Sequence, residues 1–290
     1  MANDKATTEA TGRRSHSPGL GHRTSLVIGL ALAALLIAAA AIGPWLWSLD
    51  PLAMDFAAPL APPSADHPMG TDANGRDVLA RALAGARISL FVGAIVVATG
   101  FLSGGGVGIA AALGRRWLDA LLMRIVDALA AFPPLVLAMA VTVGFGVGLT
   151  TATVGIALSC VPFFARLMRA DVLRIRALPF VEASVAVGVG PWRMIFRHVL
   201  PHAAPTMLVQ CASVFGYAIL TLAGLGFIGL GAQIPEPEWG AMITDGMQYA
   251  LTGQWWLAFY PGLAVLLAVV AVNLLADYAQ AALGVRGLEA

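Results

Sequence analysis

Residues 177–201 read ALPFVEASVAVGVGPWRMIFRHVLP, a stretch that combines apolar side chains, glycines, prolines and arginines. A first short helix is predicted over residues 180–187, and Gly188, Gly190 and Pro191 are predicted to end it. Pro191 also suits the first turn of a second helix, because the fixed φ and missing N–H of proline are tolerated there. The stretch therefore predicts two short helices joined by a glycine turn.

The second predicted helix, which begins at Pro191, has an apolar face and a basic face. Its apolar residues recur at i, i+3, i+4 and i+7, and they are Trp192, Ile195, Phe196 and Val199. Arg193 and Arg197 lie four residues apart on another face, and Pro201 is predicted to stop the helix. Such a helix lies on an anionic lipid surface or docks on a partner protein, and its periodicity does not choose between the two.

The composition of the whole chain is that of a membrane protein. Of its 290 residues, 59% are hydrophobic and 11% are charged, and the mean hydropathy is +0.83. A soluble domain carries roughly 25% charged residues, so this chain has too few to cover its surface in water. The solvent around it is therefore expected to be largely lipid. Nucleic-acid binding is not expected, because no basic face is dense enough to bind a phosphate backbone.

Six apolar runs are long enough to cross a bilayer, whose core is about 30 Å thick and takes about 20 helical residues. They are Leu26–Leu49, Ile88–Leu113, Ile125–Val147, Thr150–Met168, Ala203–Leu230 and Trp256–Ala276. The first is longer than the core of a secretory signal and is expected to remain as a span. Pro133 and Pro134 are predicted to kink the third run or to mark its start. A glycine-rich turn at residues 144–149 predicts that the third and fourth runs form a tight antiparallel pair.

The basic residues predict which end of each span is cytoplasmic. With the N-terminus inside, three of the 17 basic residues lie in the first external loop (Arg76, Arg81 and Arg87) and the other fourteen lie in cytoplasmic segments. This bias predicts that both termini are cytoplasmic. The predicted divisions are a polar tail (1–24), a first transmembrane helix (25–50), an external loop with an amphipathic helix (51–86), a five-helix core (87–281) that includes a long cytoplasmic loop (169–202), and a cytoplasmic tail (282–290).

The sequence shows no catalytic or ion-coupling machinery. The central parts of the runs hold no Asp, Glu, Lys, Arg or His, so no proton relay is expected. The only lysine is Lys5, which excludes a phosphate-binding loop that ends in Gly-Lys-Ser/Thr. No metal site is predicted at His198 and His202, because Pro201 lies between them and would disturb a regular helical pair. Energy for uphill transport would have to come from another chain.

Small residues repeat within the second run, where Gly100, Gly104 and Gly108 are four residues apart. Such a repeat lets another helix backbone approach closely, although membrane helices also tolerate glycine without any such role. Both interpretations stay open at this point. Cys160 and Cys211 are the only cysteines, and both are predicted to be buried, inert thiols because they lie inside apolar runs.

Several motifs resemble one family of transport proteins. Residues 182–184 (Glu-Ala-Ser), Gly188 four residues later and residues 200–201 (Leu-Pro) resemble the EAA signature of permease subunits of binding-protein-dependent ABC importers. The ending at residues 197–201 (Arg-His-Val-Leu-Pro) resembles that of the dipeptide, oligopeptide and nickel branch. Residues 229–240 are similar to the loop that follows the fifth span in that branch.

The segment that precedes the second span also resembles that branch, over residues 67–90. Its residues predict a helix with Asp72 or Asn74 as the N-terminal cap, since short polar side chains are preferred there. Asp77 and Arg81 are four residues apart, so they are predicted to form an ion pair along this helix.

The resemblance implies a type I ABC importer permease fold in the inner membrane of a bacterium. It implies a homologous second permease, two cytoplasmic ATPases that bind ATP and Mg²⁺, and an extracytoplasmic solute-binding protein, with no catalytic residue, metal or cofactor on this chain. The residues implied to couple to the ATPase are Glu182, Ala183, Ser184, Gly188, Trp192, Arg193, Arg197, His198, Leu200 and Pro201. An acidic outer loop is predicted either to contact the binding protein or to be an ordinary solvated loop, and its residues are Glu236, Glu238, Trp239 and Asp245.

The transported substrate is only weakly indicated by the sequence. Peptides are favoured over nickel, because the spans hold no histidine. The alternatives are the same importer architecture for nickel or another small solute, and a channel that works without an ATPase.

Overall fold

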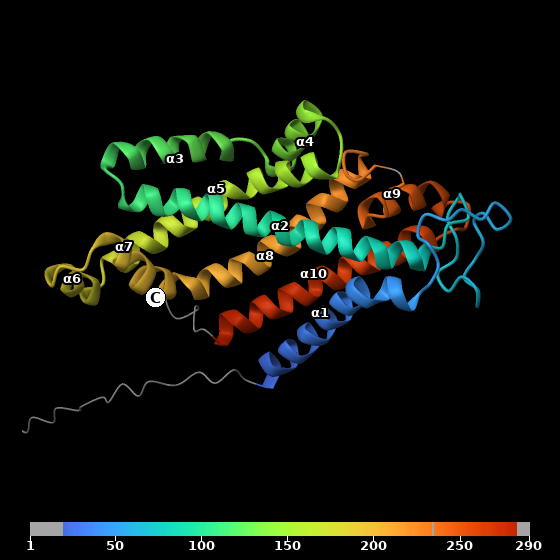
Figure 1. Ribbon diagram of the computed structural model, residues 1–290, viewed down its shortest axis with the longest axis horizontal. Helices are drawn as coiled ribbons and strands as arrows, with labels where there is room; N and C mark the ends of the chain where they lie inside the picture. Colours follow the sequence, from blue (N-terminus) through green and yellow to red (C-terminus); the bar gives the residue numbers. More distant parts are fainter. Residues whose placement is uncertain (1–19, 234, 283–290) are drawn as a thin grey trace, which may run out of the picture.

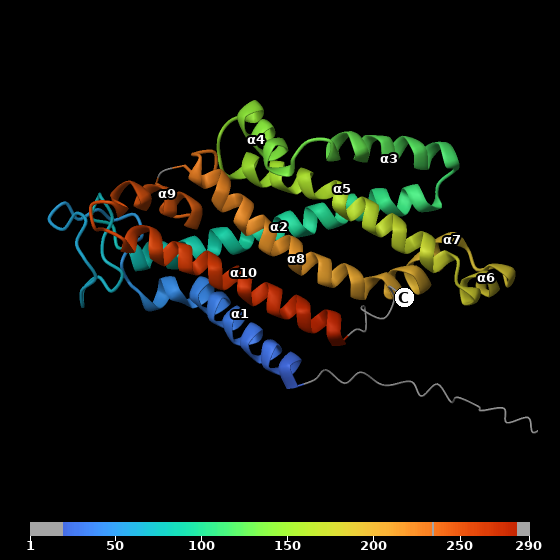
Figure 2. The same cartoon turned by 180° about the vertical axis from the view of Figure 1, so that it is seen from behind.

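The computed structural model describes residues 20–233 and 235–282, and the named elements of these residues are all helices (Figures 1 and 2). In chain order they are α1 Leu20–Leu46, α2 Val78–Leu113, α3 Arg116–Ala130, α4 Pro134–Phe145, α5 Leu149–Arg176, α6 Pro179–Ala186, α7 Pro191–Met194, the π-helical turn η1 Ile195–Val199, α8 Leu200–Phe227, α9 Trp239–Ala250 and α10 Trp256–Ala282. The predicted all-α class is confirmed for this part of the chain.

The long helices lie side by side along the molecule, and its two ends differ (Figure 1). At one end lie α6, α7 and the turn between α2 and α3, and we call it the α6 end. At the other lie α9 and the loop of residues 47–77, and we call it the loop end; the view from behind agrees (Figure 2). Helix α2 packs most extensively on α5, while α1 and α8 both pack on α10.

Five helices are long and apolar enough to cross a membrane, namely α1, α2, α5, α8 and α10. The third predicted run, Ile125–Val147, is not one continuous helix, because α3 and α4 meet at 86° across a break at residues 131–133. Pro133 and Pro134 explain the break, since neither has an N–H for the helical ladder. The bent pair is the sixth candidate span. The glycine turn at residues 146–148 joins α4 to α5, which pack together as predicted.

A pair of hydrogen bonds ties α1 to α2 near the loop end. Pro44 lies inside α1 and has no N–H, so the Ala40 carbonyl loses its helical partner. Arg87 of α2 donates from Nε to the Ala40 carbonyl and from Nη2 to the Ala41 carbonyl, the latter at 3.0 Å. Arg87, which the sequence indicated only as an external basic residue, therefore satisfies the Ala40 carbonyl that the proline leaves open and also bonds to the Ala41 carbonyl.

The start of α2 differs from the predicted one. Asp77 is the N-cap, in place of Asp72 or Asn74, and its Oδ1 accepts a hydrogen bond from the Ala80 N–H at 2.7 Å. The helix then continues without interruption to Leu113. The predicted division between an external loop (51–86) and a core (87–281) therefore falls inside a single helix, and the described residues 47–77 form no separate amphipathic helix before it.

The predicted ion pair between Asp77 and Arg81 is also wrong. Asp77 accepts from the Trp47 indole at 3.0 Å, and its other oxygen lies 2.8 Å from His67 Nδ1, so both oxygens are already used. Arg81 pairs instead with Asp72, at 3.6 Å between Nε and Oδ2. Contacts across the fold replace the local i,i+4 contact at this position.

Glycines set the close approach of α2 to α5. A Cβ on Gly104 would lie 2.6 Å from the Val161 carbonyl oxygen, and a Cβ on Gly108 would lie 2.5 Å from the Ala165 carbonyl oxygen. A real Cβ does not come so close to backbone atoms, so a side chain at either position would force the helices apart. The interpretation of this repeat as a close-approach surface is confirmed.

Two ion pairs fasten α3 to α5 towards the α6 end. Arg169 donates from Nε and Nη2 to the two oxygens of Asp119 at 2.6 and 2.7 Å, and Arg166 Nη2 lies 2.7 Å from Asp127 Oδ1. The second of these pairs joins Asp127 of α3 to Arg166 of α5. Both cysteines are free thiols, one buried and one half-buried: Cys160 and Cys211.

Candidate functional site

Helix α6 ends in a turn that depends on Gly188. This glycine has a φ of +83°, in the left-handed region that side chains disfavour. The turn lets the Val189 N–H donate back to the Ser184 carbonyl at 3.1 Å, and the Val187 N–H donates to the Ala183 carbonyl at 3.2 Å. A left-handed residue followed by this long backward bond is the Schellman arrangement. The predicted end of the first short helix at Gly188 is confirmed.

The prediction that the second short helix stops at Pro201 is wrong. The helix continues from α7 through η1 into α8. The Leu200 N–H donates to the Ile195 carbonyl, the wide hydrogen bond of a π turn. Because the helix is already widened immediately before Pro201, the chain passes the proline ring without stopping. The predicted second helix is therefore the N-terminal part of the long helix that forms the fifth predicted span.

One face of this segment packs onto α5 and the start of α8. The buried residues of the cluster are Ala112, Met168, Val172, Ile175, Val181, Met194, Val199, Ala203 and Met207. The predicted apolar stripe is right for Ile195 and Val199 and wrong for Phe196, which is 64% exposed. A π turn holds more residues than the 3.6 of an α-helix, so Phe196 rotates off the buried face.

The opposite face is exposed and mixes apolar with basic side chains. We call residues 179–201 the α6–α7 element. Val187 is 81% exposed beside the turn, Phe196 is exposed as well, and the side chains of Arg193 and Arg197 also face outward. Large apolar groups left open next to arginines are typical of a surface that binds another protein.

The remaining residues implied to couple to an ATPase lie along the same element. The Ser184 hydroxyl donates to the Phe180 carbonyl at 2.7 Å, and the Phe180 ring stacks on His202 with centroids 5.0 Å apart, which links α6 to α8. Two of the residues are exposed and one is half-buried: Ala183, Pro201 and Leu200. Three have side chains outside the described part of the structure: Glu182, Trp192 and His198. The coupling role of this set stays a prediction.

Of the four residues predicted for the acidic outer loop, two are buried and two are exposed. Glu238 and Trp239 are each 1% exposed, so they offer no contact surface and this part of the prediction is wrong. Trp239 packs α9 against α2, where its indole donates to the Ala82 carbonyl at 3.0 Å. Glu236 and Asp245 are exposed, and their contact with a binding protein stays a prediction.

Glu238 caps α9 from its buried position. Its Oε1 accepts from the Ser89 hydroxyl at 3.2 Å and from the Gly240 N–H at 2.9 Å, and its Oε2 accepts from the Ala241 N–H at 2.9 Å. Burial raises the pKa of the Glu238 carboxyl above its usual value near 4.5, and the three hydrogen bonds act in the opposite direction. The carboxyl thus joins α9 to α2 and is sensitive to pH.

We expect the thermal stability of the protein to fall as the pH rises above the ordinary pKa of Glu238, and Glu238→Gln to remove this part of the pH dependence. The folded state holds the proton more tightly than the unfolded state, so stability is full below the unfolded pKa and is lost as the pH rises through the folded pKa. The side chain of Asp245 is exposed but partly desolvated, which raises the pKa of its carboxyl as well; Asp245 is present in both proteins, so its contribution cancels in the comparison.

The measurement is the unfolding midpoint of the purified chain over roughly pH 4 to 8. Glu236→Gln is the matched control, because Glu236 lies two residues away but is exposed, and it should keep the wild-type profile. Identical pH profiles for the wild type, the Glu238 variant and the control would contradict the assignment.

Comparison with known proteins gives the family. The profile of the family described as "Binding-protein-dependent transport system inner membrane component" matches residues 104–286. The chain is 42% identical over 255 residues to the probable D,D-dipeptide transport system permease protein DdpC of Escherichia coli (strain K12), a match that covers 88% of this chain and 84% of that protein. It is 39% identical over 251 residues to the dipeptide transport system permease protein DppC of Alkalihalophilus pseudofirmus, covering 87% and 82%.

The fold is also found among solved structures of ABC transporters. A chain of the inward-facing MetNI methionine ABC transporter matches with a TM-score of 0.55 at 22% identity, covering 67% of this chain and 91% of that one. The family match spans the chain from the glycine repeat of α2 to beyond α10, and the α6–α7 element lies inside it. The chain therefore belongs to the family of binding-protein-dependent transport system inner membrane components, and it is a multi-pass protein of the inner membrane.

Proposed function

We propose that this chain is one of two permease subunits of an ATP-driven importer of di- or oligopeptides and forms half of its translocation pathway. The names of the relatives support the substrate class, since both of those described are permeases of dipeptide transport systems. A homologous second permease forms the other half of the pathway. Two cytoplasmic ATPases bind ATP and Mg²⁺, an extracytoplasmic binding protein delivers the peptide, and this chain performs no catalysis and holds no cofactor.

The α6–α7 element is the part of the chain that docks on an ATPase in this proposal. Its exposed face offers Val187 and Phe196 for apolar contact and Arg193 and Arg197 for acidic groups. Burying exposed apolar side chains against a partner is favourable, and the arginines add direction to the contact.

The observation that carries the proposal is the continuous helix from Pro191 to Phe227. On the other side of the element, only residues 177 and 178 separate the end of α5 at Arg176 from the start of α6. No long linker separates the element from either span, so a displacement of the element moves α5 and α8 with it. A partner that changes shape on ATP binding can therefore change the conformation of the spans, which is a coupling between two sites through a two-state element.

We expect the α6 end to be cytoplasmic and the loop end to be external, and opposite labelling of two single cysteines tests this. Arg197→Cys and Glu236→Cys are made in a chain whose own cysteines are replaced by alanine. Both positions are exposed: Arg197 lies in η1, directly after α7 at the α6 end, and Glu236 lies just before α9 at the loop end. In sealed right-side-out vesicles a membrane-impermeant maleimide should label Glu236→Cys alone, and in inverted vesicles it should label Arg197→Cys alone.

The physical basis of this orientation is the larger number of arginines at the α6 end, which includes the turn between α2 and α3. Basic residues are concentrated on the cytoplasmic side of membrane proteins. Labelling of Arg197→Cys in right-side-out vesicles would place the element outside the cell, away from any source of ATP, and the proposed coupling would then be wrong. The alanine background without added cysteine is the control for labelling elsewhere.

A further inference from the structure

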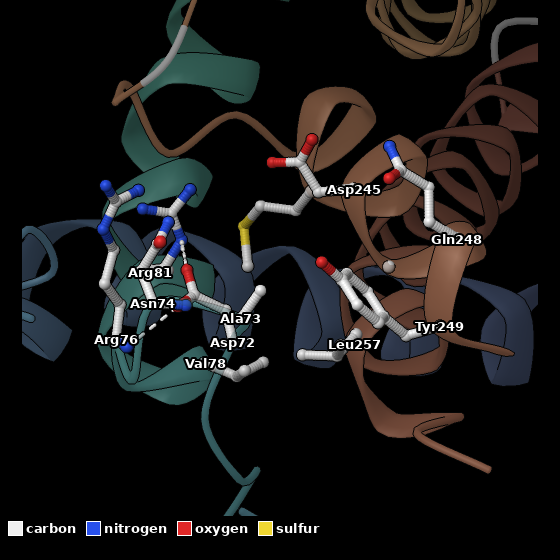
Figure 3. Close-up of a pocket in the computed structure, with 12 residues that line it drawn as sticks. Asp72, Ala73, Asn74, Arg76, Val78, Arg81, Asp245, Gln248, Tyr249 and Leu257 are labelled. Carbon is white, nitrogen blue, oxygen red and sulfur yellow. Dashed lines mark hydrogen bonds and ion pairs between the residues drawn. The ribbon is translucent and has the colours of Figure 1, made fainter. Parts of the chain in front are cut away.

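A charged cavity of about 270 Å³ lies at the loop end, between the start of α2 and α9 (Figure 3). On one side it is lined by residues that precede and open α2, and on the other by residues of α9. The charged side chains that line it are two arginines and two aspartates: Arg76, Arg81, Asp72 and Asp245. The ion pair between Arg81 and Asp72 accounts for only two of these four charges.

The arginines on the α2 side are buried, and one of them has no partner. Arg76 and Arg81 are each only 4% exposed. Arg81 has Asp72 at 3.6 Å, and its Nη1 reaches the carbonyls of Pro51 and Pro235 at 3.4 Å. The Arg76 side chain makes no hydrogen bond or ion pair with any described residue, and its Nε is buried without a partner. A buried guanidinium is stable only when paired, so Arg76 favours an anionic ligand in the cavity.

The acidic group on the α9 side is also unpaired. Figure 3 shows Asp245 across the cavity from Arg76 and Arg81. Its carboxylate makes no hydrogen bond or ion pair with the residues that the structure describes, although Arg81, Asp72 and Arg76 all act on it electrostatically. Asp72, by contrast, is used by Arg81 and by the N–H groups of Asn74 and Arg76. The cavity therefore presents one free positive group and one free negative group on opposite sides.

We propose that this cavity binds a small zwitterion, an amino acid or a short unblocked peptide, with its carboxylate at Arg76 and its ammonium group at Asp245. The inference rests on the proposed function only in that peptides of this kind are the expected cargo. The cavity volume suits a ligand of a few tens of atoms at most. Tyr249 and Gln248 line the same wall as Asp245 and offer neutral hydrogen-bonding groups beside it.

A zwitterion fits these charges better than an acidic side chain of a docking protein. Such a side chain would satisfy Arg76 but would leave Asp245 unpaired and would add a third carboxylate next to Asp72 and Asp245. Like charges in a recessed site repel more strongly than they do in open water. A ligand that carries both charges pairs Arg76 and Asp245 at once.

The test is equilibrium dialysis of labelled dialanine against the full chain, assembled with its second permease and ATPases and without binding protein or ATP. Competition uses dialanine amide, which lacks the carboxylate, N-acetyl-dialanine, which lacks the ammonium group, and acetate. We expect each blocked dipeptide to compete about tenfold less well than dialanine, since each loses one charged contact. Acetate should compete least.

Variants of the two unpaired groups assign the ends of the ligand. Arg76→Gln should weaken dialanine binding about tenfold without changing the affinity for dialanine amide, and Asp245→Asn should do the same relative to N-acetyl-dialanine. Glu236→Gln, an exposed carboxylate outside the cavity, is the control and should bind like the wild type. Asp245 is exposed, so its variant keeps the test decisive if Arg76→Gln lowers the unfolding midpoint.

The outcomes separate this inference from the proposed function. Competition by acetate as strong as that by dialanine would show a plain carboxylate site, of the kind that an acidic side chain of a binding protein fills, and would overturn the inference. Absence of dialanine binding in a complex that still imports peptides would also overturn it. Dialanine binding with the expected pattern, in a complex that shows no ATP-driven import, would leave the inference standing and contradict the proposed function.

Discussion

Replacing Gly188 by valine is expected to reduce ATP-driven peptide uptake by about tenfold or more, while the chain still inserts and folds. Gly188 holds a φ of +83° at the end of α6. A residue with a Cβ pays on the order of 1–2 kcal/mol in this conformation, and a β-branched residue is strongly disfavoured there. The turn should therefore change its shape and rotate α6 relative to α7, which breaks the surface that docks on the ATPase.

Two further substitutions separate backbone conformation from steric size. A Cβ at Gly188 or at Gly190 meets no atom within 4 Å, so neither position is crowded, and of the two only Gly188 has a positive φ. Gly190→Val should therefore transport like the wild type. Gly188→Asn should keep most of the activity, because asparagine tolerates the left-handed region better than other side chains.

The measurement is uptake of labelled dipeptide into proteoliposomes that contain the assembled importer, ATP and the loaded binding protein, together with ATP hydrolysis. Valine at position 188 should lower uptake and the hydrolysis that the loaded binding protein stimulates. Uptake by Gly188→Val at the wild-type rate, or an equal loss in Gly188→Asn and Gly188→Val, would show that the left-handed turn is not what coupling requires.

The sequence predicts this turn because its cause is local. Glycine at the end of a short helix, followed by Gly190 and Pro191, leaves few conformations other than a left-handed stop. The long apolar runs predict spans for a similar reason, since any segment of that length and hydropathy must be removed from water. Both features depend on the residues themselves and little on what packs against them.

Other positions depend on neighbours that are distant in the sequence. Asp77 and Arg81 have the spacing of a helical ion pair, but Trp47 and His67 take the aspartate and Asp72 takes the arginine. No local rule contains those partners. The i,i+4 interaction contributes only about 0.2–0.5 kcal/mol, so contacts across the fold readily replace it.

The burial of side chains at the loop end also depends on neighbours that are distant in the sequence. Glu238 and Trp239 are flanked by prolines, acidic residues and glycines, a pattern typical of an exposed loop, yet α9 packs them against α2. Arg76 was identified in the sequence only as an external charge, although its segment resembled the family. The cavity beside it arises from α2 and α9, which are about 160 residues apart in the chain and meet only in the folded state.

Pro133 and Pro201 are both predicted to interrupt a helix, but only the helix at Pro133 is interrupted. Pro133 is followed by Pro134, and two missing N–H groups in succession leave a break of 86° between α3 and α4. Pro201 follows a π turn. Val199 before it and Ala203 after it are both buried in the cluster with α5, so the helix is held in place on either side of the proline along the chain. The packing energy of that cluster opposes the local tendency to stop.

The second large effect is expected from Gly108→Leu, which should prevent α2 and α5 from packing at their present distance. A Cβ at Gly108 would lie 2.5 Å from the Ala165 carbonyl oxygen and 2.9 Å from the Arg169 nitrogen, both of them backbone atoms that cannot rotate away. Overpacking of this kind costs roughly 1–3 kcal/mol or more, and separation of the helices adds the loss of their contacts. We expect a low yield of folded chain and a fall of roughly 5–10 °C in the unfolding midpoint.

Gly106→Leu is the matched control, because it lies two residues away on the same helix and a Cβ there meets no atom within 4 Å. It should unfold at or slightly above the wild-type temperature, since leucine also favours the helix over glycine. Gly104→Leu, whose Cβ would lie 2.6 Å from the Val161 carbonyl oxygen, should repeat the defect of Gly108→Leu at an independent position. Equal unfolding midpoints for the Gly106 and Gly108 variants would mean that α2 and α5 do not approach as closely as this repeat of glycines allows. The contact between α2 and α5 would then not support the connection from the α6–α7 element into the membrane.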